Sequence, residues 1–123
     1  MTVDSAHYRQ LIVWQKAIAA AVELYRLAPK LPREEIYGMR SQITRAVVSI
    51  AANIAEGWGR ETSKDKAYFL AVAQGSLAET DTLLTLCEQL GWFPEHETAT
   101  LRALLIEVGK MLTTMRQRLR NSN

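Results

Sequence analysis

The sequence predicts an all-α fold, an antiparallel up-down-up-down four-helix bundle, from three observations. Paired prolines and glycines interrupt the chain at three places, which leaves four segments of about 20–28 residues each. Within each segment apolar residues recur at helical spacing, and the sequence lacks alternating strand-like runs. Four helices joined by short connections imply antiparallel neighbours. We expect one domain over residues 1–123, with helices near 11–28, 35–56, 63–90 and 97–119.

The helix breakers mark the predicted connections. They pair Pro29 with Pro32, Gly57 with Gly59, and Gly91 with Pro94. The middle pair lies in N-I-A-E-G-W-G-R, residues 53–60, where glycines beside polar side chains raise the question of a phosphate-binding turn. A dinucleotide-binding motif needs a preceding strand and a third glycine, whereas this stretch follows a predicted helix. We therefore predict that Gly57 is the left-handed residue after a helix, and that Thr62 caps the next helix.

The first and last predicted helices are amphipathic, with one apolar stripe each. In the helix near 11–28 the stripe comprises Leu11, Trp14, Ile18, Ala21, Val22 and Tyr25. In the helix near 97–119 it comprises Leu101, Leu104, Leu105, Val108, Leu112, Met115 and Leu119. We expect both stripes to face the core.

The helix near 35–56 carries little charge for a helix that faces solvent. Its predicted core stripe comprises Met39, Ile43, Val47, Ile50 and Ile54. A polar stripe runs beside it, made of Gln42, Arg45, Ser49, Asn53 and Glu56. Between Ser41 and Ala55 the only charged residue is Arg45, so we expect this helix to be covered on more than one side.

The helix near 63–90 shows the same pattern. Its predicted core stripe comprises Phe69, Val72, Leu83, Leu86 and Leu90. Small residues share another face: Ala71, Gly75, Ala78 and Thr82. They permit either tight packing within the bundle or a subunit interface. Two undercharged helices in one small domain favour the interface, and symmetric closed assemblies are the usual result.

Glu79 falls inside this predicted core stripe, where a carboxylate is unfavourable unless it is paired or protonated. The expected partner is Arg45 or the Asn53 amide. One interpretation is a general acid or base with a raised pKa. The other, which we favour, is a buried polar link that fixes the register of helices or subunits, because no nucleophile or metal cluster accompanies Glu79.

Other catalytic and metal sites find little support in the sequence. The two histidines, His7 and His96, lie in different segments, and no metal-ligand spacing occurs. Cys87 falls toward an apolar face and is interpreted as a core thiol rather than a nucleophile. The sequence gives no reason to expect a cofactor or a small-molecule substrate.

Basic residues gather in two clusters, the first at the start of the third predicted helix and the second at the end of the fourth. They are Arg60, Lys64 and Lys66, and Arg116, Arg118 and Arg120. We expect the two clusters at opposite poles of the bundle. Both can be solvated helix ends, or a ring of copies can multiply each cluster into a basic rim that holds a phosphate backbone.

Composition limits the class of protein. The chain has 123 residues, 48% of them apolar, and a formal net charge of +2, which permits a nucleic-acid partner without requiring one. A single cysteine excludes an internal disulfide, and the first residues lack the pattern of a signal peptide. No apolar run approaches the roughly 18 residues of a membrane helix. These features predict a cytoplasmic protein without a membrane partner.

The sequence resembles the four-helix-bundle family encoded within intervening sequences of bacterial 23S rRNA genes. The matching stretches are V-W-Q-K-A at 13–17, Q-I-T-R-A-V-V-S-I at 42–50, N-I-A-E-G-W-G-R at 53–60, F-L-A-V-A-Q-G-S-L-A-E at 69–79 and L-G-W-F at 90–93. The resemblance extends over almost the whole chain. Near Ala52 the family usually has another small residue or proline, a departure without evident consequence.

The resemblance implies a four-helix bundle that forms a homo-oligomer, in some members a pentameric ring. A related protein of diversity-generating retroelements is a basic pentamer that works with a reverse transcriptase and RNA, and V-G-K-M-L at 108–112 is similar to a stretch in it. The family's own role is undefined, and the resemblance implies no catalytic residue. Three functions follow as hypotheses: a non-enzymatic oligomer that binds RNA or DNA through basic rims, a protein-interaction scaffold, and an enzyme that uses Glu79.

Overall fold

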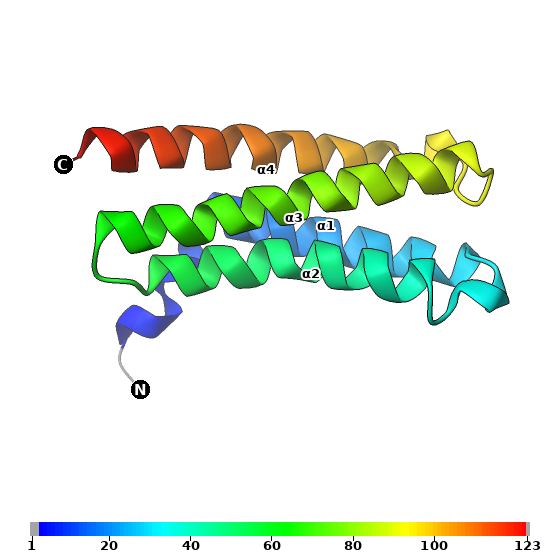
Figure 1. The fold of residues 1–123 in the computed structure, drawn as a ribbon, viewed down its shortest axis with the longest axis horizontal. Coiled ribbons are helices and arrows are strands. Elements are labelled where there is room, and N and C mark those ends of the chain that lie inside the picture. The colour runs from blue at the N-terminus through cyan, green and yellow to red at the C-terminus, as the bar shows by residue number, and fades with distance from the viewer. Residues whose placement is uncertain (1–2, 123) are drawn as a thin grey trace.

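The protein forms a bundle of four long antiparallel α-helices in the computed structural model, which describes residues 3–122 (Figure 1). The helices are α1 (Ile12–Leu27), α2 (Met39–Trp58), α3 (Ser63–Gln89) and α4 (Glu95–Asn121). Each packs on its two neighbours in the order α1, α2, α3, α4 and back to α1. The all-α, up-down-up-down prediction is confirmed, while residues 1, 2 and 123 of the predicted domain lie outside the described part.

Three 3-10 helices that the sequence did not predict lie before α1 and in the connection from α1 to α2. They are η1 (Val3–Gln10), η2 (Ala28–Lys30) and η3 (Arg33–Glu35). Consequently α2 begins at Met39 rather than near residue 35, with Gly38 at its N-cap. The Glu35 carboxylate accepts a hydrogen bond of 3.0 Å from the free backbone N–H of Met39, which satisfies a donor that the helix leaves open.

The core lies along the bundle axis and consists of aliphatic and small side chains. All five residues of the predicted α2 stripe are buried, as are Leu101, Leu105, Val108 and Leu112 of α4. In α1 and α3 the predicted stripes are wrong by about one residue. The residues that α1 and α3 bury are Val13, Ala17, Ala20, Leu24, Leu27, Leu70, Ala73, Thr80, Leu84 and Cys87.

The misassigned faces have a common physical reason. In α1 small alanines face the axis, which lets neighbouring backbones approach, and the larger Ile18, Val22 and Tyr25 face outward. In α3 apolar residues occur around most of the helix, so periodicity alone does not choose the buried face. Both helices therefore expose large apolar side chains that the sequence analysis had placed in the core.

The turn between α2 and α3 differs from its prediction at one glycine. Gly57 lies inside α2, and Gly91 is the glycine with a positive φ (77°) among the described residues. A Cβ atom at Gly57 would lie 2.8 Å from Cβ of Phe69 and 3.3 Å from the Lys66 carbonyl oxygen. Gly57 is thus required by the close approach of α3 rather than by a left-handed turn. The Thr62 cap is confirmed, because its Oγ1 accepts a hydrogen bond of 3.1 Å from the Asp65 N–H.

Candidate functional site: a basic pole and apolar flanks

The two basic clusters lie at the same end of the bundle. In an up-down-up-down arrangement α2 and α4 end where α3 begins, and Figure 1 shows the α2–α3 turn and the C-terminus at one end. The hydroxyl oxygens of Ser63 in α3 and Ser122, the residue after α4, lie 3.3 Å apart, within hydrogen-bond distance. The expectation of opposite poles was therefore wrong. We call this end the basic pole, defined by Arg60, Lys64, Lys66, Arg116, Arg118 and Arg120.

Half of the basic-pole cations are already engaged within the chain. Arg60 pairs with Glu56 at 3.1 Å and lies over the Phe69 ring. Lys66 donates a 2.8 Å hydrogen bond to the Trp58 carbonyl oxygen and lies over the indole. Arg116 donates to the Gln74 side-chain oxygen.

The other three cations are directed to solvent. Lys64, Arg118 and Arg120 are exposed, and none of them forms an ion pair with a residue in 3–122. They can meet a phosphate group without breaking an internal contact. The basic pole thus combines three exposed cations with three cations that contact other residues of the chain.

The opposite pole has a different charge pattern. There α2 and α4 begin, and its carboxylates are Glu23, Glu34, Glu35, Glu88, Glu95 and Glu97. Several of the cations at this pole are neutralised, for example Lys30 by Glu97 at 2.7 Å. Arg26, Lys30, Arg33, Arg40 and Arg102 nearly balance these carboxylates. At the basic pole Glu56, Glu61 and Asp65 accompany six cations, so the excess positive charge lies at that end of the bundle.

The predicted polar stripe of α2 contacts α3 in its middle. Asn53 donates hydrogen bonds of 2.8 and 2.9 Å to the carbonyl and hydroxyl oxygens of Ser49, and Ser76 of α3 donates to the same hydroxyl at 2.8 Å. This network joins two helices within one chain. Glu56 lies outside it and pairs with Arg60.

Glu79 is exposed, contrary to the prediction of a buried carboxylate. The core position belongs to the next residue, Thr80, whose hydroxyl donates to the Ser76 carbonyl at 2.8 Å. Arg45 and Glu79 line the same shallow hollow between α2 and α3, and Arg45 donates instead to the Ser41 carbonyl. Because Glu79 is exposed to solvent, the burial on which the general acid–base interpretation rested is missing, and that interpretation loses its physical basis.

Cys87 lies in the core, as predicted. Burial raises the pKa of its thiol to about 11, with smaller contributions from Glu35 and Glu88. A thiol with so high a pKa carries little thiolate at neutral pH, which argues against a nucleophilic role. In the part of the chain that the structure describes, no group of three or more His, Cys, Asp and Glu side chains is placed to hold a metal ion.

A charged cluster that the sequence analysis missed joins α3 to α4. Arg102 of α4 donates to both oxygens of the Glu88 carboxylate, to Asp81 at 2.8 Å and to Thr85 at 3.0 Å. Thr98 also donates to Glu88, whose side chain is 9% exposed. The Arg102 hydrogen bond lowers the pKa of Glu88 and outweighs its burial, while the same contact raises the pKa of Arg102.

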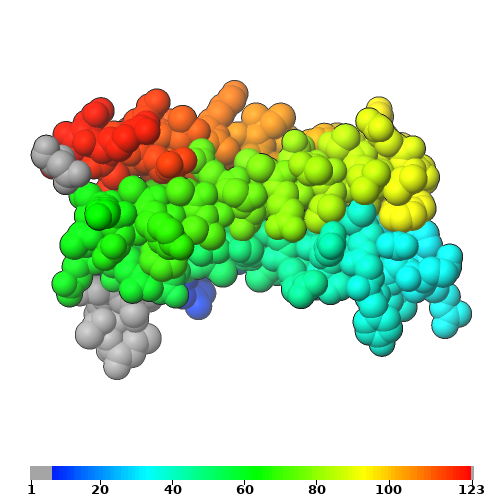
Figure 2. Space-filling model, viewed as in Figure 1, coloured from blue at the N-terminus to red at the C-terminus, as the bar shows by residue number. Residues whose placement is uncertain are grey.

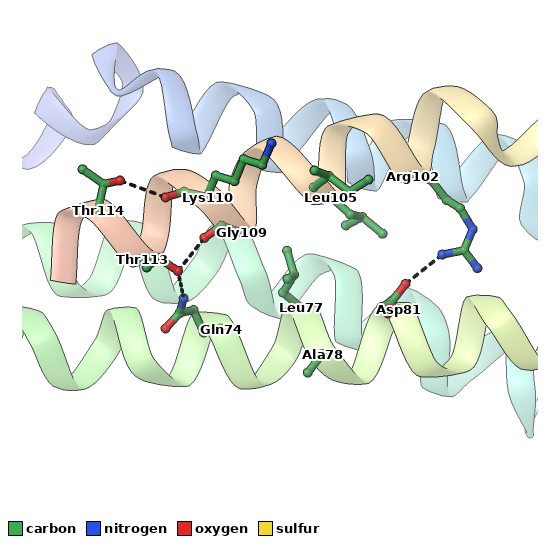
Figure 3. Close-up of a pocket in the computed structure, with 11 residues that line it drawn as sticks. Gln74, Leu77, Ala78, Asp81, Arg102, Leu105, Gly109, Lys110, Thr113 and Thr114 are labelled. Atoms are coloured by element: carbon green, nitrogen blue, oxygen red, sulfur yellow. Dashed lines mark hydrogen bonds and ion pairs between the residues drawn. The ribbon is translucent and has the colours of Figure 1, made fainter. Parts of the chain in front are cut away.

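A groove of about 730 Å³ runs between α3 and α4 (Figure 3). Gln74 donates to Thr113 at 2.9 Å, and Arg102 contacts Asp81, so its polar side chains bond to one another across the groove. Gly109 and Ala78 also line the groove, and they have no side chain large enough to fill it. In Figure 2 α3 and α4 form a continuous surface along this side of the molecule. The groove is lined by both apolar and charged side chains, among the latter Asp81, Arg102 and Lys110.

A second flank, on α1 and α2, is more apolar. Its exposed side chains are Ile18 (38% exposed), Val22 (43%), Tyr25 (54%) and Val48 (43%). Ala51, Ala52 and Ala55 form a shallow hollow beside them. On α3, diagonally across the bundle from α1, Tyr68 and Leu86 are also exposed. We call these surfaces the α1–α2 flank and the α3 flank.

No helix among the described residues has the length and hydropathy needed to cross a bilayer. Known proteins provide two further findings. A solved structure described as a protein with unknown function from the S23 ribosomal protein family of Bacteroides thetaiotaomicron is similar to this chain. The two are 25% identical with a TM-score of 0.78, and the match covers 85% of this chain and 98% of the other. No curated protein matches the chain.

The family comparison agrees with this structural likeness. The model of the 23S rRNA-intervening sequence protein family matches residues 9–114, which include parts of all four helices and both flanks. The resemblance noted in the sequence is thereby confirmed. The chain belongs to the 23S rRNA-intervening sequence protein family.

Proposed function

We propose that the protein is a non-enzymatic homo-oligomer, a pentameric ring in the cytoplasm, that binds the phosphate backbone of structured RNA or DNA. The observation that supports it is the convergence of two basic clusters at one pole. Cations from three chain segments lie there, and Lys64, Arg118 and Arg120 have no internal ion pair among residues 3–122. Binding is electrostatic, with little reading of base sequence.

The exposed flanks support self-association. The α1–α2 flank and the α3 flank are different surfaces of one protomer, because they share no residue. Contact between unlike surfaces is heterologous, and it closes into a ring when the rotation permits. All copies in such a ring point the same way, so the basic poles form one rim instead of the two expected from sequence.

Neutralising the free cations at the basic pole should reduce both affinity and its salt dependence. We expect Lys64→Gln/Arg118→Gln/Arg120→Gln to bind a single-stranded RNA at least about tenfold more weakly. The salt slope, which is the slope of log affinity against log salt concentration, should be smaller in magnitude by about 2. The measurement is fluorescence anisotropy over a series of salt concentrations. The control, Arg26→Gln/Arg33→Gln/Arg40→Gln, removes the same charge near the other pole and should leave the slope unchanged. Equal loss in both variants, or no binding by the native protein at low salt, contradicts the proposal.

Charged substitutions in the α1–α2 flank should dissociate the oligomer. Ile18→Glu/Val22→Glu places two carboxylates where the proposed interface excludes water, so we expect the dissociation constant to rise at least about a hundredfold. Multi-angle light scattering measures the mass of each variant. Gln117→Glu, at an exposed position of α4, should keep the native mass. If the native protein is a monomer at micromolar concentration, the ring is disproved.

A heterologous protein partner is the competing function, because an apolar flank can also receive another protein. Nuclease treatment separates the two. If a protein partner stays bound after nuclease treatment and the chain it binds is a monomer, the scaffold interpretation is favoured over the ring.

A further inference from the structure

An apolar hollow of about 460 Å³ opens at the basic pole between α1 and α4. Trp58, from the end of α2, forms part of its wall. The rest of the apolar lining comprises Leu11, Ile12, Val13, Met111, Met115 and Leu119. We call this hollow the end pocket. It is separate from both flanks and from the α3–α4 groove, since it shares no lining residue with them.

Charge is present at the margin of the end pocket. Arg118, one of the exposed cations of the basic pole, lines it together with Ser122. Lys66 lies over the Trp58 indole, 4.7 Å from the ring centroid, so a second cation adjoins the aromatic wall. The pocket therefore combines an apolar interior with positive charge at its edge. A ligand that matches both features has a flat apolar group next to an anion.

We propose that the end pocket receives an unpaired nucleobase whose attached phosphate is contacted by Arg118. The inference rests on the proposed function and specifies its partner: nucleic acid with unstacked nucleotides, such as a single strand or a loop. Proteins bind such nucleotides by stacking bases on aromatic side chains beside a cationic track. Met111 and Met115 suit this role because thioether side chains adapt to flat ligands of different outline.

The lining of the end pocket also predicts which features of a nucleic-acid ligand the protein does not distinguish. Its lining offers few hydrogen-bond partners besides Ser122 and Arg118, and the Ser122 hydroxyl already donates to the Leu119 carbonyl at 2.9 Å. Base edges are therefore not read, and any base with an exposed face enters. A duplex has no such base, because its faces are covered by neighbouring pairs. The preference is for unpaired over paired nucleic acid rather than for a sequence.

The test compares ligands of equal phosphate charge. The probes are an oligoadenylate of about 12 nucleotides, the same backbone with abasic positions, and a duplex of matched length. We expect the native protein to bind the oligoadenylate about tenfold more tightly than the abasic strand, at one salt concentration. The ratio of these two affinities is the readout, because changes in overall charge affect both ligands alike.

Two variants remove the aromatic and apolar parts of the pocket. Trp58→Leu should bring the ratio close to one without changing the salt slope, and Trp92→Leu at the other pole is its control. Ile12→Gln, at a residue 55% exposed that tolerates a polar side chain, should lower the ratio about threefold even if Trp58→Leu fails to fold.

The outcomes separate this inference from the proposed function. Absence of salt-dependent binding to every probe refutes the proposed function. Tight binding with equal affinity for oligoadenylate and abasic strand refutes the end pocket alone. A change of oligomer mass in Ile12→Gln would show that a second copy covers the pocket, and would likewise overturn the inference.

Discussion

Replacing Arg102 with leucine should destabilise the bundle by about 3 kcal/mol, because it leaves a buried carboxylate without its partner. Arg102 gives Glu88 most of its hydrogen bonds, and the Glu88 side chain is 9% exposed, so solvent cannot replace the lost donors. Chemical denaturation followed by circular dichroism measures the change. The double variant Arg102→Leu/Glu88→Leu removes both charges and should recover much of the lost stability.

The same ion pair sets an acid limit on stability. The pKa of Glu88 is lowered from 4.5 in the folded chain, so its contribution is fully present above about pH 4.5 and is lost as pH falls through the folded value. Arg102→Leu removes the largest cause that lowers the pKa of Glu88, so this acid dependence should weaken in the variant. If the variant shows the native stability and pH profile, Arg102 is only a surface contact.

Two glycine-to-alanine substitutions should have opposite effects on stability. Gly57→Ala inserts a Cβ atom 2.8 Å from Cβ of Phe69, so α2 and α3 must separate, and we expect a loss of about 2 kcal/mol. Gly75→Ala, in the middle of α3 where a Cβ atom would meet nothing within 4 Å, should add about 0.5–1 kcal/mol through helix propensity.

The pair is compared by thermal unfolding at low protein concentration, where the monomer dominates. Oligomer mass provides an additional reading for Gly75→Ala, because Gly75 lies on the α3 flank. Equal loss of stability in both variants would contradict the role given to Gly57. It would indicate instead that both glycines are required by a subunit contact.

The fold was predictable because helix length and turn position are local properties. Periodicity and paired breakers located α2, α3 and α4 to within a few residues. All five residues of the predicted α2 stripe are buried, although the buried Ala46, Ala51 and Gly57 were not predicted. The faces of α1 and α3 were not, because hydrophobicity alone favours Ile18 and Val22 over Ala17 and Ala20 for the core. Where two helices pack closely, the small alanines are buried instead of the larger residues. How closely they pack depends on the partner helix, which the sequence of one helix does not reveal.

The site was predictable in composition but not in arrangement. Each basic cluster could be read from the sequence, whereas their convergence follows from the bundle topology, which places the start of α3 beside the end of α4. The Arg102 cluster left a partial signal, since Asp81, Thr85 and Glu88 share one face of α3. This signal could be interpreted as a contact with Arg102 only once α4 was known to pack on that face. The prediction that Glu79 is buried was wrong for a related reason, because shifting the buried face of α3 by one residue exchanges Glu79 with Thr80.

If the protein binds nucleic acid as proposed, the unequal ends of the bundle determine where a probe can be attached without disturbing that binding. The connection from α1 to α2 lies at the carboxylate-rich pole and presents Tyr37, which is 95% exposed. A dye or surface linker placed at residue 37 would anchor the molecule with its cationic end facing the bulk solution. The same linker on the last turn of α4 would hide that end, so immobilised protein should capture nucleic acid in the first geometry and fail in the second.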